Sequence, residues 1–111
     1  MFRLFRRPAH IEAREAAALF ADGRALPMDV REKQEWKSGH IRGARHIPLG
    51  SLGEKLAANA ISKDQTVICI CQSGMRSGRA QSLLERHGIE ALNMSGGMHR
   101  WREAGLPVTT Q

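Results

Sequence analysis

The chain has 111 residues, of which 41% are hydrophobic and 25% charged, and its formal net charge at pH 7 is +6. This length and composition fit one globular domain and exclude a membrane-spanning helix, because no apolar run approaches the roughly 20 residues that a bilayer requires. The basic start, residues 1–8, is followed by no long apolar stretch or cleavage site. We therefore expect no signal peptide and a cytoplasmic location.

Charge and cysteine content narrow the classes of partner. The basic residues are spread from Arg3 to Arg102 rather than gathered in one run, so we expect no nucleic-acid partner, while small anions fit the charge. The two cysteines, Cys69 and Cys71, are too few for a disulfide framework, and the chain does not show the four Cys or His ligands in paired spacings of a structural zinc site. We expect neither a metal nor a cofactor.

Short apolar runs alternate with helix-like segments along the whole chain. In chain order the sequence predicts a helix over 11–21, a strand over 25–30, a helix over 32–38, a strand over 44–47, a helix over 49–59, a strand over 66–71, a helix over 77–87, a strand over 91–94 and a helix over 98–104. This alternation predicts an α/β fold around a parallel sheet. Ligands of such sheets bind beyond the carboxyl ends of the strands, where Asp29, Cys71 and Ser95 are expected.

The segment from Cys71 to Ser77 carries the strongest chemical signal. Cys71 ends the most apolar strand, Gly74 permits backbone angles that other residues resist, and a helix is predicted to begin at Ser77. Backbone N–H groups and a helix N-terminus that converge on a thiol lower its pKa and make it a nucleophile. Arg76 adds a fixed cation, so the segment predicts a reactive cysteine.

This segment, Cys-x-x-Gly-x-Arg-Ser, resembles the active-site loop of single-domain members of the rhodanese family. Residues 29–48 and 93–108 are similar to the family's first and closing signatures. The resemblance implies a rhodanese-like fold, a five-stranded, mostly parallel sheet with helices on both faces, formed by a single domain over residues 9–109. Residues 1–8 precede the family core as an N-terminal extension that packs on the domain, touches a membrane surface weakly or is disordered.

The resemblance also implies a sulfurtransferase. Its catalytic Cys71 takes the outer sulfur of thiosulfate, releases sulfite and carries a persulfide, which a thiophilic acceptor such as cyanide or a thiol then removes. The rim of the loop is largely neutral, which leaves Arg76, Arg79 and Arg45 to attract a charged donor. The expected sulfur-binding loop consists of Gln72, Ser73, Gly74, Met75, Arg76 and Ser77.

Residues around the loop are expected to support it. Asp29 and Arg31 are predicted to hold neighbouring loops in place, and Arg79 faces either the site or solvent. Ser77 either donates to the sulfur or caps the following helix. Cys69 lies inside its strand and is expected to pack in the core, with a role as a resolving thiol left open.

Three other functions stay open at this point. A sulfur-relay module receives its persulfide from a partner protein, a phosphatase or arsenate reductase acts on an oxyanion, and a binding module keeps the fold without chemistry. Four residues separate Cys71 from Arg76, whereas cysteine phosphatases use five, so the loop favours sulfur over phosphate. The physiological donor, the acceptor and the oligomeric state are left open.

Overall fold

The structure is a computed structural model that describes residues 9–111, so the extension expected over residues 1–8 lies outside the described part. One sheet has the strand order β1-β5-β4-β2-β3, and every pairing within it is parallel. The strands are β1 (His10–Ile11), β2 (Leu26–Asp29), β3 (Arg45–His46), β4 (Val67–Ile70) and β5 (Ala91–Met94). The helices are α1 (Ala13–Ala21), α2 (Lys33–Lys37), α3 (Leu49–Ala57), α4 (Met75–Arg86) and α5 (Gly97–Glu103).

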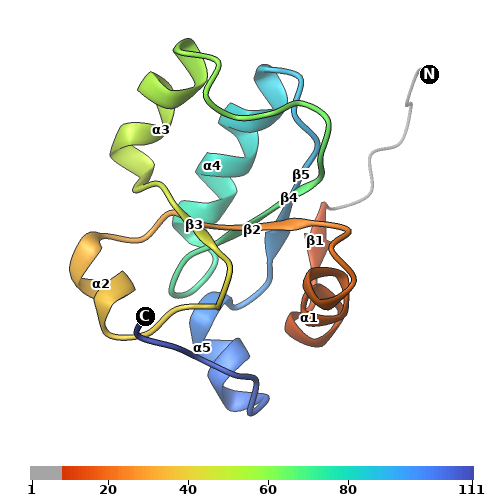
Figure 1. Cartoon of the computed structure of the whole chain (residues 1–111), viewed down its shortest axis with the longest axis vertical. Helices are drawn as coiled ribbons and strands as arrows, with labels where there is room; N and C mark the ends of the chain where they lie inside the picture. The colour runs from red at the N-terminus through yellow and green to blue at the C-terminus, as the bar shows by residue number, and fades with distance from the viewer. Residues whose placement is uncertain (1–8) are drawn as a thin grey trace.

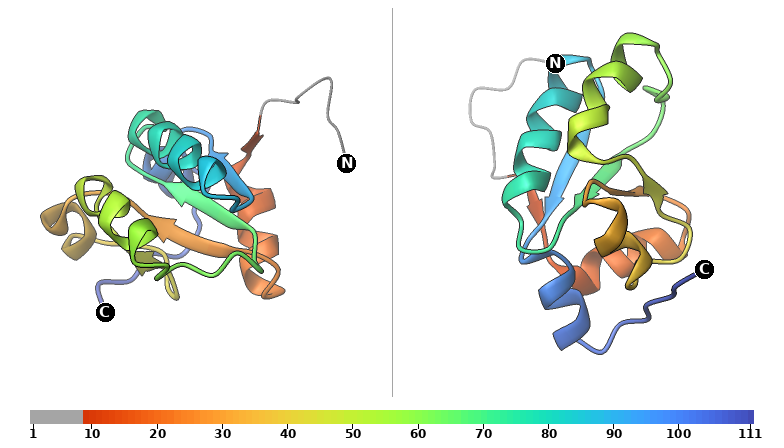
Figure 2. Two further views of the ribbon diagram at one scale, coloured as in Figure 1. Left: turned by 90° about the horizontal axis from the view of Figure 1, so that it is seen from above. Right: turned by 90° about the vertical axis from the view of Figure 1, so that its left-hand side faces the viewer.

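Helices cover both faces of the sheet (Figures 1 and 2). On one face, Leu56 of α3 and Leu84 of α4 pack in the core cluster that includes Cys69 and Cys71. On the other face, α1 and α5 contribute to a second cluster, which contains Trp101. The predicted α/β architecture, with a parallel sheet and helices on both faces, is therefore confirmed.

The central strand β4 explains why the sheet is parallel and enclosed. All four of its residues are buried, and their side chains alternate between the two core clusters. A strand that is covered on both faces has a continuous apolar sequence, as Val67–Ile70 does. The same alternation places Cys69 and Cys71 on one face, as their spacing predicts.

The structure corrects two element boundaries. Ile11 was predicted to begin a helix, but it belongs to β1, where it pairs with Met94 of β5, and α1 begins at Ala13. Two residues are too few to display the alternating pattern of a strand in the sequence. The strand exists because these residues pair with β5. Helix α4 begins at Met75 rather than at Ser77, since Gly74 serves as its N-cap.

The carboxyl ends of β2, β4 and β5 meet at one edge of the sheet. Asp29 ends β2, Cys71 follows β4 and Ser95 follows β5. The loop after β4 lies there between α2 and the start of α5, as Figure 1 shows. This edge therefore brings together the residues that the sequence places in the site.

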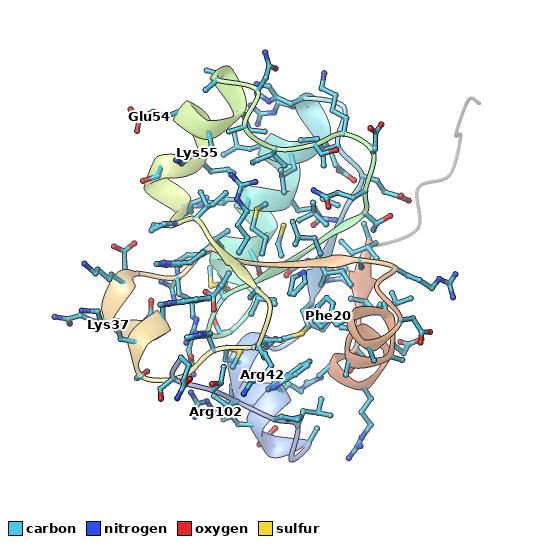
Figure 3. The ribbon with its side chains drawn as sticks, viewed as in Figure 1. Phe20, Lys37, Arg42, Glu54, Lys55 and Arg102 are labelled. Atoms are coloured by element: carbon cyan, nitrogen blue, oxygen red, sulfur yellow. The ribbon has the colours of Figure 1, made fainter. Side chains whose placement is uncertain are left out.

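Exposed positions of α2 and α3 carry charged side chains. Figure 3 shows Lys37, Glu54 and Lys55 projecting outward from α2 and α3. Phe20 of α1 instead packs near Trp101 of α5, with ring centroids 6.1 Å apart. Within residues 9–111, no helix combines the length and the apolar character needed to cross a membrane.

Candidate active site

The Cys71 sulfur lies inside a ring of hydrogen-bond donors. The backbone N–H of Gly74 donates to Cys71 Sγ over 2.9 Å, and Ser77 Oγ lies 3.3 Å from the same sulfur. Gly74 has a φ of 109°, in the left-handed region that favours glycine, and this conformation turns the chain back toward the sulfur. Cys71 is 1% exposed, while Gln72 and Ser73 above it are exposed, so the sulfur is shielded by the rim of its own loop.

Helix α5 orients the peptide groups of this ring. The carbonyl of Cys71 accepts the N–H of Met98 over 2.8 Å, and the carbonyl of Gln72 accepts the N–H of His99 over 3.2 Å. In a trans peptide the C=O and the following N–H point in opposite directions. Because the two carbonyls face α5, the N–H groups of Gln72 and Ser73 point away from α5, and the Ser73 N–H is one of the donors that act on Cys71.

The hydrogen bonds around Cys71 give the two cysteines different thiol pKa values. Burial by itself raises the pKa of the Cys71 thiol, but the Ser77 hydroxyl and the N–H groups of Ser77, Gly74 and Ser73 outweigh it and lower this pKa. Burial, with the negative charges of Cys71 and Glu85 nearby, raises the pKa of Cys69 to about 12. Cys71 is therefore the thiol suited to react, and the fully buried Cys69 belongs to the core.

Arg76 is paired with a carboxylate. Its two terminal nitrogens donate to the two oxygens of Glu35 over 2.6 and 2.8 Å, and both side chains are about one-third exposed. The hydrogen bonds from Arg76 are the main reason why the pKa of Glu35 falls to about 2. The ion pair joins α2 to α4 and takes up the cation that the sequence places beside the sulfur.

Neither of the other two arginines expected to attract a donor is hydrogen-bonded to the Cys71 loop within residues 9–111. Arg79 is exposed, and no hydrogen bond or ion pair joins it to another residue between 9 and 111. Arg45 donates to the carbonyl of Ala60 over 2.9 Å. Ala60 follows α3, which returns to the opposite edge of the sheet before β4, so Arg45 extends away from Cys71.

A hollow that contains one arginine adjoins the loop. An open hollow of about 350 Å³ is lined by Gln72 and Ser73 on one side and by Gly96, His99 and Arg100 on the other. Sequence reasoning did not single out His99 and Arg100, because nothing in their spacing links α5 to a loop more than 20 residues earlier in the chain. The folded chain thus supplies a cation near the loop from a helix that the motif does not include.

Ser77 lies in the first turn of α4 and not at its cap, so the capping alternative is wrong.

Two further residues of the site, Asn93 and Glu35, were missed from sequence. Asn93 of β5 is 5% exposed and hydrogen-bonds to the hydroxyl of Ser77. A polar residue inside the apolar run Ala91–Met94 was the available signal for Asn93. Glu35 gave no such signal, since a carboxylate in a capping box already has a local role.

Asp29 and Arg31 form a buried ion pair behind the site. The Arg31 guanidinium contacts both Asp29 carboxylate oxygens at 2.8 to 3.1 Å, and its Nη2 also donates to the carbonyl of Gly39 over 2.7 Å. Both residues are at most 1% exposed. The pair ties the end of β2 to the segment after α2, and α2 carries the Glu35 that holds Arg76. These contacts fit a supporting role.

Metal ligands are not gathered at this edge. Among residues 9–111, no group of three or more His, Cys, Asp or Glu side chains lies close enough to hold a metal ion.

Gly97 offers a direct test of how closely α5 must approach the loop. Its φ is +54°, and an added Cβ would lie 2.2 Å from the carbonyl oxygen of Cys71 and 2.6 Å from the carbonyl carbon of Gln72. Gly97→Ala therefore has to displace the loop backbone. We expect a loss of about 1–3 kcal/mol in the free energy of unfolding, together with slower alkylation of Cys71 by iodoacetamide. Chemical denaturation and mass spectrometry measure the two effects.

Gly96→Ala is the matched control for this change. Gly96 also has a positive φ, +72°, and an added Cβ there lies 2.0 Å from Cγ and 2.9 Å from Cβ of Arg100, within α5, rather than against the loop backbone. We expect Gly96→Ala to lose stability as well, because these atoms must shift, but to retain the Cys71 alkylation rate. Equal slowing of alkylation in both variants would show that the contact between α5 and the loop does not orient the sulfur ring.

Known proteins share the sequence pattern and the fold of this chain. The model of the Rhodanese-like domain family matches residues 12–104. A rhodanese-related protein from Thermoplasma volcanium has a similar structure, with a TM-score of 0.85 and 29% identity over 92% of this chain and 98% of that chain.

Curated relatives include proteins named for sulfur transfer. The putative sulfurtransferase YtwF of Bacillus subtilis is 38% identical over 78% of this chain and 82% of its own length. The thiosulfate sulfurtransferase PspE of Escherichia coli is 32% identical over 64% and 68%. The putative sulfur carrier protein YrkF of Bacillus subtilis is 36% identical over 67% of this chain, which spans 40% of that longer protein. From its family match, its fold and these relatives, the chain belongs to the rhodanese family.

Proposed function

We propose that this protein is a sulfurtransferase that carries a sulfane sulfur on Cys71, and that residues 9–109 form its catalytic domain. The Cys71 thiolate attacks the outer sulfur of thiosulfate or a similar donor. A new sulfur–sulfur bond forms to Cys71 Sγ, and the donor's sulfur–sulfur bond breaks, with its electron pair leaving on sulfite. Cyanide or a thiolate then attacks the outer sulfur of the persulfide, and the Cys71 thiolate is regenerated.

The observation that carries this proposal is the ring of donors around Cys71 Sγ. A thiolate is stabilised by the N–H of Gly74 at 2.9 Å and by the further donors that lower its pKa. After transfer, the negative charge lies on the outer sulfur, where inward-pointing N–H groups of the loop act as they would on an oxyanion. The same ring thus stabilises both the nucleophile and the intermediate.

The length of the loop argues against phosphoryl chemistry. Four residues separate Cys71 from Arg76, whereas cysteine phosphatases use five. Each terminal nitrogen of Arg76 also donates to Glu35, which leaves only the remaining N–H groups of the guanidinium for an anion. The short loop favours a sulfur donor over a phosphate ester. An anionic donor such as thiosulfate meets the guanidinium of Arg100, which also faces the exposed Glu12 over 3.5 Å, in the hollow beside the loop.

A sulfur relay is the second candidate function. Met75, at the start of α4 and on the rim of the loop, is 80% exposed, which suits contact with another protein better than with a small anion. One relative is named as a putative sulfur carrier protein. In this alternative, Cys71 receives its sulfur from a persulfide on a partner protein.

Thiosulfate loading tests the proposal. Incubation with thiosulfate should add the mass of one sulfur atom to the protein, with release of one equivalent of sulfite. Because the donors around Cys71 lower its pKa from 9.0, the thiolate is already formed below the usual range. The loading rate should therefore rise with pH with a midpoint below the ordinary thiol value of 9.0.

The outcome separates the two candidates. A protein that thiosulfate does not load, but that takes one sulfur from the persulfide of a cysteine desulfurase, is a relay module and not a thiosulfate sulfurtransferase. A protein that neither donor loads would contradict both functions.

A further inference from the structure

Asn93 contacts the middle and the end of the sulfur loop from a neighbouring strand. Its Nδ2 donates to the carbonyl oxygen of Gly74 over 3.0 Å, and its Oδ1 contacts the hydroxyl of Ser77. Gly74 is the residue whose N–H reaches the Cys71 sulfur, and Ser77 Oγ lies 3.3 Å from the same atom. The Asn93 carboxamide thus contacts two of the residues that donate to the sulfur.

Hydrogen-bond polarity fixes the direction of these contacts. A carbonyl oxygen only accepts, so the NH₂ end of Asn93 must face Gly74 and the oxygen end must face Ser77. The amide oxygen also only accepts, and a serine hydroxyl has a single hydrogen. The Ser77 hydrogen is therefore engaged by Asn93 in this arrangement.

A conflict arises when Cys71 loses its proton. As a thiol, Cys71 donates its S–H to Ser77 Oγ, and the hydroxyl donates onward to Asn93, so each group is satisfied. A thiolate has no hydrogen and needs donors. The one hydrogen of Ser77 then has two competing acceptors, the sulfur and the Asn93 oxygen.

We propose that Asn93 is a positioning residue for the sulfur chemistry: it anchors the loop through Gly74 and competes with the Cys71 sulfur for the hydroxyl hydrogen of Ser77. The hydroxyl donates to Asn93 while Sγ carries no charge, and it turns to Sγ when the thiolate forms. In the persulfide the charge lies on the outer sulfur, so the hydroxyl returns to Asn93. Release of the outer sulfur regenerates charge on Sγ, and the hydroxyl follows it.

The competition determines in which states of the reaction the Ser77 hydroxyl donates to Sγ. Its hydroxyl stabilises Sγ in the two states in which this atom is anionic, before donor attack and as the leaving group in transfer to the acceptor. In the loaded state the N–H groups of the loop hold the outer sulfur without it. This assignment rests on the proposed function only in naming Cys71 as the sulfur carrier.

Thiol titration tests the competition without any sulfur donor. We would measure the pH dependence of Cys71 alkylation by iodoacetamide in the wild type, Asn93→Ala, Ser77→Ala and the double variant, counting one modified cysteine by mass. Cys69 does not interfere, because it is fully buried and burial raises its pKa to about 12. The Ser77→Ala background removes the contested hydrogen and leaves the Gly74 anchor as the only action of Asn93.

We compare the midpoint shift that Asn93→Ala causes when Ser77 is present with the shift that it causes in the Ser77→Ala background. We expect the first midpoint to move to lower pH relative to the second. The difference corresponds to about three- to tenfold more thiolate at a pH well below the midpoint, as expected for one hydrogen bond freed to reach a charged group. Asn93→Leu, which fills the same space without a donor or acceptor, gives the same comparison if the alanine variant does not fold.

Equal midpoint changes in the two backgrounds would overturn the proposal and leave Asn93 as a scaffold residue only. The proposal would also be overturned if Asn93→Ala moved the midpoint to higher pH by more with Ser77 present than in the Ser77→Ala background. Failure of thiosulfate loading in the wild type contradicts the sulfurtransferase proposal but leaves this comparison unchanged, so the two failures are distinguishable.

Discussion

Replacing Cys71 with alanine is expected to abolish sulfur loading, whereas replacing Cys69 with alanine is expected to leave it close to the wild-type rate. The proposed reaction forms a covalent bond to Cys71 Sγ, and loss of a covalent nucleophile lowers turnover by a factor on the order of 10⁴ or more. Cys69 is fully buried in β4 with its pKa raised to about 12, so it holds no reactive thiolate at neutral pH. Sulfite release and intact mass after thiosulfate treatment measure both variants.

The two substitutions form a matched pair. Both remove one sulfur from the same face of the sheet, two positions apart in the chain. Cys69→Ala leaves a small cavity that costs about 1 kcal/mol of stability, which circular dichroism under denaturation detects separately from activity. A sulfur adduct on folded Cys71→Ala, or loss of the adduct from folded Cys69→Ala, would contradict the assignment of Cys71 as the carrier.

The fold was largely predictable because each central element carries its own signal. The apolar run at β4 and the alternation of strands with helices are local properties of the sequence, and they lead to a parallel sheet. Strand β1 was not predictable in this way. His10 and Ile11 become a strand only by pairing with Asn93 and Met94, more than 80 residues later in the chain.

In the candidate site, too, residues with a local signal were predictable and residues brought in by the fold were not. Cys71 and its loop form one continuous segment, so a motif with fixed spacing makes them visible. Glu35 and Asn93 reach the loop from 41 and 16 residues away along the chain. Only the folded sheet edge brings them to Arg76 and Ser77, and Glu35 changes the electrostatics by pairing with the cation that the motif places near the sulfur. Motif spacing does not encode such pairings.

Arg31→Met is expected to lower the free energy of unfolding by about 3–5 kcal/mol, a large share of the total for a domain of this size. Methionine removes the guanidinium while keeping much of its length, so within residues 9–111 the buried Asp29 carboxylate keeps only the backbone N–H of Arg31 as a donor. The carbonyl of Gly39 also loses its partner. Denaturant unfolding at an unchanged m-value would measure the loss.

Arg100→Met provides the exposed counterpart. Arg100 faces Glu12 at 3.5 Å with both side chains more than half exposed, so its removal should cost less than about 1 kcal/mol. Replacing both buried partners, as in Asp29→Leu with Arg31→Met, should be less damaging than Arg31→Met alone, because no unpaired charge stays inside. If Arg31→Met were as mild as Arg100→Met, the buried pair would not be what fixes α2, and the position of Glu35 against Arg76 would need another cause.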